Sequence, residues 1–137
     1  MMDQMDVRWL QRFSNFKKAF GQLEKILSLP QLNEIEEQGC IQAFEYTFEL
    51  SWKTMQDLLK AKGLEDAIGP RPVIRMAFQV GLVEDGAAWL EMQKSRNLTS
   101  HAYQEETAKE VLGKIRADYY DLFATLKQRL EKEEENG

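Results

Sequence analysis

Apolar residues recur at steps of three and four along most of the chain, the spacing that places them on one face of an α-helix. The first run of this kind consists of Trp9, Phe13, Phe16, Phe20, Leu23 and Leu27. Ser28-Leu29-Pro30 follows it, and proline can neither continue a helix nor tolerate a helical residue before it. The pattern therefore predicts a long first helix over residues 7–27.

A second apolar stripe predicts another long helix. Its members are Ile41, Phe44, Phe48, Met55 and Leu59. Trp52 and Leu58 lie beside this stripe and widen it, so the helix is expected to contact more than one neighbour. We expect it to end near Lys62-Gly63, because glycine suits a left-handed C-cap, and we interpret the acidic stretch 34–39 as a loose lead-in.

Two shorter helices are predicted in the middle of the chain. The segment 68–72 carries two prolines and a glycine, and Pro72 suits a first helical turn. A short helix over residues 72–80 is expected to end at Gly81. Glu84 or Asp85 can then cap a fourth helix that runs toward Arg96.

The last stripe lies beyond Ser100 and predicts a helix of roughly 30 residues. It contains Val111, Ile115, Tyr119, Leu122, Leu126 and Leu130. The charged tail 131–137 is expected to be a frayed, solvated end. Together the patterns predict an all-α, up-and-down bundle of three long and two short helices, resembling a four-helix bundle and forming one domain over residues 1–137.

Composition and charge narrow the classes of function. The 137 residues are 43% hydrophobic and 30% charged, with a net charge of -5, which excludes a broad basic surface for duplex DNA or anionic lipid. One cysteine, Cys40, and one histidine, His101, supply no zinc ligand set and no internal disulfide. We expect no metal and no cofactor.

We expect neither a secretory signal nor a membrane-spanning segment in this sequence. The polar residues 1–8 do not resemble a secretory signal, and no apolar run approaches the roughly 18 residues of a membrane span. We therefore expect a soluble cytoplasmic protein. The first helix offers more aromatic surface than one neighbour needs, so part of that surface is expected to be buried between chains.

The segment most suited to chemistry runs from Arg96 to Tyr103. It reads Arg-Asn-Leu-Thr-Ser-His-Ala-Tyr. In one continuous helix, Arg96 and His101 would stand about 140° apart around the axis. A helix break after Asn97, with Thr99 or Ser100 capping the last helix, would let both side chains converge.

Arginine and histidine together suit the cleavage of RNA without a metal. An imidazole exchanges protons near neutral pH and can take the proton of a 2′-hydroxyl, which then attacks the adjacent phosphate. A guanidinium can bind the phosphate and stabilise its developing charge. The alternative is that His101 has only a structural role at a helix junction.

The same segment resembles the Arg-x4-His-x-Tyr motif of the HEPN family, in particular the branch paired with minimal nucleotidyltransferases. Residues 44–53, Phe-Glu-Tyr-Thr-Phe-Glu-Leu-Ser-Trp-Lys, are similar to the second-helix signature of that branch. Residues 71–78 and 85–90 are similar to its middle region. The resemblance covers most of the chain from Phe44 to Tyr103.

This resemblance implies a homodimeric bundle with two Arg/His motifs in one cleft and a minimal nucleotidyltransferase encoded nearby. It implies an RNase toxin in which Arg96 and His101 are catalytic and Asn97 assists. It also implies that the nucleotidyltransferase, as antitoxin, adenylylates Tyr103. The same branch has been described as substrate-binding subunits of nucleotidyltransferases, so a non-catalytic subunit that holds a nucleotide or substrate in this cleft is the alternative.

Further residues are candidates for substrate binding. Glu45 and Glu49 lie one turn apart and can orient His101 or meet Arg96, although an ordinary ion pair is the alternative. Lys53 and Arg75, with Arg71 and Lys94, can meet phosphates, or form a solvated charged face. Trp52 and Trp89 can stack on a base, or anchor the core.

Overall fold

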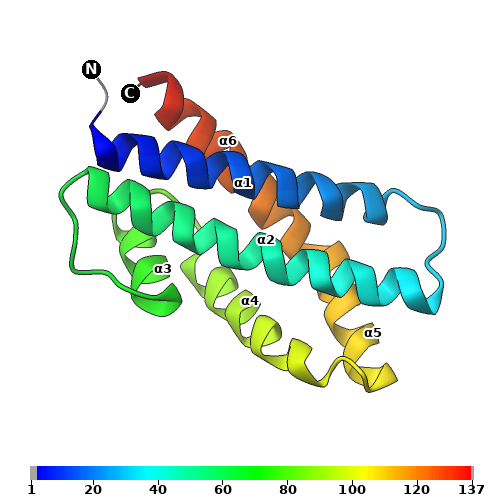
Figure 1. The fold of residues 1–137 in the computed structure, drawn as a ribbon. Coiled ribbons are helices and arrows are strands. Elements are labelled where there is room, and N and C mark those ends of the chain that lie inside the picture. The colour runs from blue at the N-terminus through cyan, green and yellow to red at the C-terminus, as the bar shows by residue number, and fades with distance from the viewer. Residues whose placement is uncertain (1–2, 137) are drawn as a thin grey trace.

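A computed structural model describes residues 3–136, and these form an all-α bundle without a β-strand. Helices α1 and α2 pack side by side in antiparallel directions; α3, α4 and α5 pack against α2, and α6 packs against α1 (Figure 1). The start of α1 and the end of α6 lie at the same end of the bundle. The helices are α1 Gln4–Leu27, α2 Glu34–Ala61, α3 Pro70–Gln79, α4 Gly86–Leu98, α5 Glu105–Lys114 and α6 Tyr120–Asn136.

The long second helix starts earlier than its apolar stripe suggests. Asn33 accepts a hydrogen bond from the backbone N–H of Glu36, and the Glu36 carboxylate accepts one from the backbone N–H of Asn33. This reciprocal capping box satisfies two backbone donors that a helix end leaves unpaired. The interpretation of residues 34–39 as a loose lead-in is therefore wrong, because they form the first turns of α2.

The aromatic residues of α1 are buried within the chain. Trp9, Phe13, Phe16 and Phe20 are each at most 5% exposed. Phe123 on α6 meets Phe16 and Phe20 edge-on, with ring centroids 6.2 and 6.0 Å apart. The expectation that part of this surface is buried between chains is wrong, because α2 and α6 together supply the two neighbours that the stripe needs.

The short helices have the predicted boundaries to within two residues. Gly69 precedes α3 with a φ of 90°, a backbone conformation that glycine adopts without strain. Gly81 follows α3 with a φ of 83°. Asp85 then caps α4 by accepting a hydrogen bond from the backbone N–H of Ala88 at 3.0 Å, as one of the two expected capping residues.

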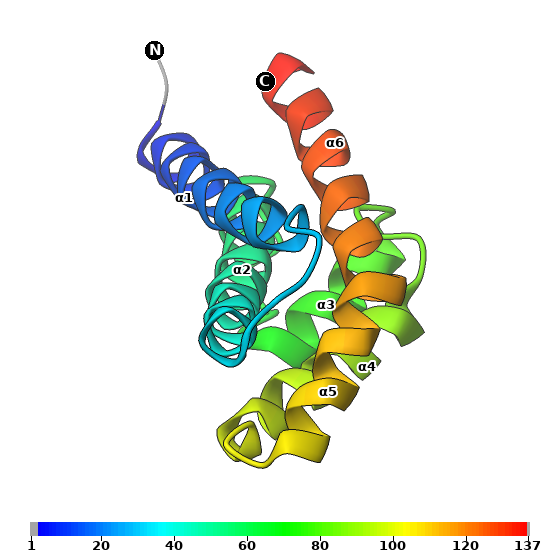
Figure 2. The same cartoon turned by 90° about the vertical axis from the view of Figure 1, so that its right-hand side faces the viewer.

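The last part of the chain forms one continuous rod, visible in Figure 2, in which α5 passes through a π-helical segment, Ile115–Tyr119, into α6. The segment places the Tyr119 hydroxyl 2.6 Å from the Ser95 hydroxyl, in the buried contact between α4 and the rod. Glu133 near the end of α6 pairs with Lys62 on the C-cap of α2. Residues 131–136 are therefore helical, and the expected fraying of this stretch is wrong; residue 137 lies outside the described residues.

Within residues 3–136, no helix is both long enough and apolar enough to cross a membrane.

Candidate functional site

The segment from Arg96 to Tyr103 turns later than the sequence predicts. Arg96 lies in the last turn of α4, and the helix tightens into a 3-10 turn over Thr99–His101. The chain bends only at residues 102–104, and α5 starts at Glu105. The expected break after Asn97, with Thr99 or Ser100 capping the last helix, is wrong, because the Thr99 hydroxyl bonds back to the Arg96 carbonyl oxygen at 2.6 Å and prolongs the helical path.

The Arg96 guanidinium lies between two carboxylates of α2. Arg96 Nη1 is 3.0 Å from Glu45 Oε2, and Arg96 Nε is 3.3 Å from Glu49 Oε1. Nε is buried and forms no well-directed hydrogen bond with the described residues, so its attraction to Glu49 is electrostatic. The Arg96 side chain is 28% exposed, which leaves part of the guanidinium open to solvent.

Thr99 links this ion pair to the 3-10 turn. Its hydroxyl accepts a hydrogen bond from Arg96 Nη1 at 3.0 Å and lies 2.9 Å from Glu45 Oε2. The single hydroxyl proton is shared between the Glu45 carboxylate and the Arg96 carbonyl oxygen. Glu45, Arg96 and Thr99 thus fasten the end of α4 to the middle of α2.

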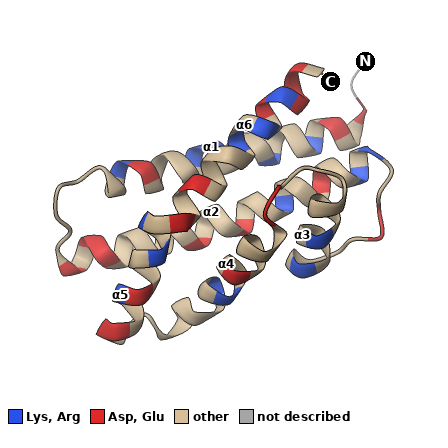
Figure 3. Cartoon of the chain, turned by 180° about the vertical axis from the view of Figure 1, so that it is seen from behind, with Lys and Arg blue, Asp and Glu red and all other residues tan. Residues whose placement is uncertain are grey.

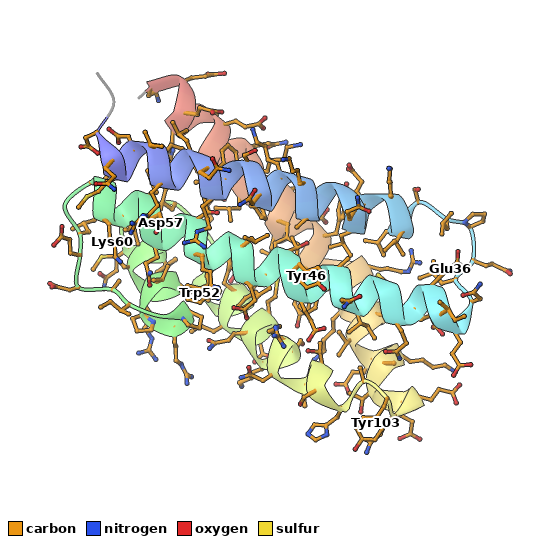
Figure 4. The ribbon with its side chains drawn as sticks, in the orientation of Figure 1. Glu36, Tyr46, Trp52, Asp57, Lys60 and Tyr103 are labelled. Carbon is orange, nitrogen blue, oxygen red and sulfur yellow. The ribbon has the colours of Figure 1, made fainter. Side chains whose placement is uncertain are left out.

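Glu49 also connects the cluster to an aromatic residue. The indole N–H of Trp52 donates to Glu49 Oε2 at 3.2 Å, and Lys53 Nζ lies 5.8 Å from the centre of the Trp52 ring. Trp52 is half-buried, and Tyr46 stands exposed further toward the start of α2 (Figure 4). Two carboxylates, one cation and two aromatic rings therefore lie along this part of α2, and Arg96 of α4 is the second cation of the group.

His101 and Tyr103 form a separate, solvent-facing pair. Both are exposed, Tyr103 to 76%, and their ring centroids are 6.2 Å apart. Figure 4 shows Tyr103 beyond the end of α4. Arg96 and His101 share no hydrogen bond within residues 3–136, because Arg96 is directed to α2. Asn97 is exposed between them, and its carbonyl oxygen accepts a hydrogen bond from Ser100.

The remaining candidates lie apart from this segment. Arg75 is exposed on α3 and lines a groove of about 590 Å³ with Phe78 and the start of α4, roughly 15 Å along the axis of α4 from Arg96. Lys94 pairs with Glu91 at 3.3 Å on the surface. Trp89 is 1% exposed and belongs to the core, which leaves no face for a base.

The charged groups of the site largely pair with one another. Seen from behind, acidic and basic residues are interspersed along the helices (Figure 3). Glu45 and Glu49 outnumber Arg96 in the cluster, and Lys53, one turn from Glu49, brings the formal charge of the group to zero. In the described part of the chain, no group of three or more His, Cys, Asp or Glu residues has the arrangement of a metal site.

Sequence reasoning overlooked two side chains that hold this segment in place. Thr99 was expected only as a cap, and Gln38 on α2 was not considered, although its Nε2 donates to the Ala102 carbonyl oxygen at 3.0 Å. The signal that could have found them was spacing: Gln38, Glu45 and Glu49 are seven and four residues apart, which places polar side chains on one face of a helix.

Comparison of the chain with known proteins identifies its family. Residues 11–132 match the family model described as "Nucleotidyltransferase substrate binding protein like". The chain belongs to this family. The match includes α2, α4 and the whole segment from Arg96 to Tyr103, and it confirms the resemblance to the HEPN branch that is paired with minimal nucleotidyltransferases.

Individual relatives agree with this assignment. The chain is 36% identical over 81 residues to a protein of Haemophilus influenzae named "Probable ribonuclease HepT", and the match spans 56% of each chain. A crystal structure of a Thermus thermophilus protein superposes with a TM-score of 0.78 at 35% identity, covering 84% of this chain and 98% of that one.

A second solved structure gives the same fold. It is a Haemophilus influenzae protein described as having the fold of a substrate binding domain of a nucleotidyltransferase, with a TM-score of 0.76 and 27% identity. The alignment covers 87% of this chain and 98% of that one. The all-α bundle predicted from the apolar stripes is thereby confirmed by both the structure and its relatives.

Proposed function

We propose that this chain is the HEPN-type partner of a minimal nucleotidyltransferase in a cytoplasmic toxin–antitoxin pair, and that it cleaves RNA without a metal. The observation that carries the proposal is the exposed His101 ring at the end of the 3-10 turn, beside the exposed Tyr103. A general base has to reach its substrate, and a histidine with this exposure can. The name of the ribonuclease relative supports the same reading.

In the proposed reaction, the His101 imidazole takes the proton of a ribose 2′-hydroxyl. The freed oxygen attacks the adjacent phosphorus and the bond to the 5′-oxygen breaks, so that a cyclic phosphate remains; the leaving 5′-oxygen takes a proton from water, and the imidazolium then returns its proton to the solvent. The guanidinium of Arg96 stabilises the negative charge on the phosphate, and Asn97 assists. Glu45 and Thr99 occupy Arg96 Nη1, so the phosphate would approach the other terminal nitrogen, Nη2.

A homodimer is part of the proposal, because within one chain the Arg96 guanidinium contacts α2 whereas the His101 ring lies beside Tyr103 and faces solvent. Two apolar side chains on these helices are exposed: Tyr46 on α2 is 56% exposed, and Leu98 within the segment is 40% exposed. Burying such side chains against a second copy is favourable, and the pairing would place two Arg96/His101 sets in one cleft. Lys53 would contact the RNA backbone there, whereas Arg75 would act at the distant groove.

Incubation of the purified protein with cellular RNA in EDTA tests the enzyme reading. Cleavage is expected for the natural sequence, and His101→Ala is expected to abolish it. The exposed residue Gln104 provides a matched control, since Gln104→Ala alters the same turn without touching the imidazole. Intact RNA with every variant, under conditions where circular dichroism shows folded helices, would eliminate the ribonuclease proposal.

A second candidate is a non-catalytic subunit that presents a nucleotide or substrate to the nucleotidyltransferase. The family description and the description of the Haemophilus influenzae structure favour it. Co-purification with the neighbouring nucleotidyltransferase and ATP, followed by mass spectrometry of Tyr103, separates the two. Adenylylated Tyr103 supports the toxin, and nucleotide retained without modification supports the subunit. If neither modification nor bound nucleotide is found, the result supports a purely structural partner.

A further inference from the structure

One face of α2 contacts the Arg96–Tyr103 segment at successive points. Glu49 and Glu45 meet Arg96, Glu45 also meets Thr99, and Gln38 meets the Ala102 carbonyl oxygen at 3.0 Å. The order is reversed between the two segments, as expected when two helices run in opposite directions. Gln38 is the member of this row whose contact lies closest to His101 and Tyr103 along the chain.

Apart from the bonds of Thr99 and Gln38 to α2, the turn that carries His101 and Tyr103 is held by short-range bonds. The backbone N–H of Ala102 donates to the Thr99 carbonyl oxygen, and the backbone N–H of Gln104 donates to the His101 carbonyl oxygen. Gln104 is the N-cap of α5 but makes no side-chain capping bond. Thr99 joins the start of the turn to Glu45, whereas beyond His101 the buried Ala102 and the Gln38 amide join it to the rest of the bundle.

The bond from Gln38 fixes one particular peptide plane. Its acceptor is the carbonyl group of the peptide that joins Ala102 to Tyr103. The orientation of that plane sets the direction in which the chain leaves Ala102, and hence the position of the Tyr103 ring relative to the His101 ring. A donor on a rigid helix can thus control the geometry of both exposed side chains without touching either.

We infer that Gln38 is a positioning residue that holds the His101–Tyr103 turn in its working geometry. The inference deepens the proposed function, since it names the group that orients the proposed base and the proposed modification site. Gln38 itself is exposed, so its replacement opens no cavity in the core. An effect of replacement on the site can therefore be separated from an effect on folding.

Gln38→Met tests this inference, because methionine has the same length and lacks the donor. Gln42→Met is the matched control, since Gln42 is an exposed glutamine one turn further along α2. Gln38→Lys is the rescue variant, as lysine restores a donor of similar reach. If Gln38→Met fails to fold, Gln38→Glu repeats the comparison with the shape kept and the donor removed.

The readout is the nuclear magnetic resonance of the imidazole, which is unambiguous because His101 is the only histidine of the chain. We expect Gln38→Met to shift the His101 ring signals and weaken the nuclear Overhauser contact with Tyr103. Gln42→Met should leave both unchanged, and Gln38→Lys should restore them. RNA cleavage is expected to fall about fivefold in Gln38→Met, the effect of one hydrogen bond.

Unchanged His101 signals and an unchanged contact with Tyr103 in Gln38→Met would overturn the inference. If the natural sequence cleaves no RNA, the proposed function fails, but the resonance comparison still decides whether Gln38 positions the turn. A loss of thermal stability with unaltered His101 signals would assign Gln38 a structural role only, and would equally overturn the inference.

Discussion

Arg96 and Glu45 form an ion pair across the contact between α4 and α2, with Arg96 Nη1 3.0 Å from Glu45 Oε2. Both side chains are slightly more than a quarter exposed, so water screens the pair only in part. Arg96, the residue proposed to bind phosphate, therefore also stabilises the contact between α4 and α2. Activity lost on replacing Arg96 has to be compared with the stability lost at the same time.

A double-mutant cycle with Arg96→Met and Glu45→Gln measures this coupling. We expect a coupling free energy of about 1 kcal/mol in urea unfolding, because partly buried pairs interact more strongly than exposed ones. The pair of Lys94 and Glu91, which is 70% and 57% exposed, is the control and should give a value near zero. Equal coupling free energies in the two cycles would show that the partly buried Arg96–Glu45 pair stabilises the fold no more than an exposed ion pair does.

The π-helical segment is expected to depend on Tyr119. Its hydroxyl lies 2.6 Å from Ser95 Oγ in a buried position, so Tyr119→Phe leaves the Ser95 hydroxyl without that partner. We expect a loss of about 1–2 kcal/mol of unfolding free energy. Tyr120→Phe is the control, because the hydroxyl of Tyr120 bonds to Glu24 at the surface. The prediction is contradicted if both variants lose the same amount.

Phe123 is the aromatic centre of the core. Its ring lies 5.9 Å from that of Trp89 and 6.1 Å from that of Phe44, in addition to its contacts with α1. Phe123→Ala is expected to cost roughly 3–5 kcal/mol, the usual effect of removing a buried phenylalanine. Ile35→Ala, at a position 83% exposed, should change the unfolding free energy by less than about 0.5 kcal/mol. A small loss for Phe123→Ala would contradict this central place in the packing.

Cys40 is expected to be unreactive in the folded protein. Burial raises the pKa of its thiol from 9.0 to about 11, with Arg116 lowering it and Glu37 raising it to smaller extents. The reactive thiolate is therefore about a hundredfold scarcer near pH 8 than for an ordinary thiol. Because the folded pKa is the higher one, the neutral thiol's contribution to stability is complete below pH 9 and is lost as the pH rises toward 11.

Modification by a disulfide reagent checks this prediction. Labelling should require unfolding by denaturant, whereas a thiol placed at an exposed site, Ser100→Cys in a Cys40→Ala background, should react at once. Rapid labelling of native Cys40 would show that the region around the start of α2 opens readily.

The sequence predicted the helices well because apolar spacing reports directly on burial. The stripe from Trp9 to Leu27 predicted α1 to within three residues, and the stripe from Val111 to Leu130 predicted the rod of α5, the π-helical segment and α6, although not its end at Asn136. What failed depended on polar side chains whose partners apolar spacing does not reveal. Asn33 and Glu36 cap the start of α2 by two reciprocal hydrogen bonds, which the spacing of apolar residues does not predict.

The site was predictable in its residues but not in their contacts. The order Arg96, His101, Tyr103 identified the segment, and the family match agrees with it. The hydrogen bonds of Thr99 to Glu45 and of Gln38 to Ala102 join residues 54 and 64 positions apart in the sequence, so no local sequence pattern predicts them. Nor can spacing tell whether Arg96 turns toward His101 or toward Glu45, because either neighbour offers a favourable interaction.

The end of α6 is expected to contribute stability that depends on pH through Glu133. Lys62 Nζ lies 2.9 Å from Glu133 Oε2, and Arg129 Nη1 lies 2.6 Å from Glu133 Oε1. Burial by itself raises the pKa of Glu133, but the hydrogen bonds from the two cations outweigh it and lower the pKa below 4.5. The folded state thus favours the ionised carboxylate.

Replacement of this carboxylate measures its contribution directly. Because the folded pKa is the lower one, the stabilisation is complete above pH 4.5 and is lost as the pH falls through the folded value. Glu133→Gln is expected to lower the unfolding free energy by about 1 kcal/mol near pH 7 and by progressively less as the pH falls below 4.5. Glu135→Gln, at an exposed position two residues on, should show no such dependence. A penalty for Glu133→Gln that stays constant with pH would mean that packing, rather than the charge of Glu133, ties the end of α6 to α2.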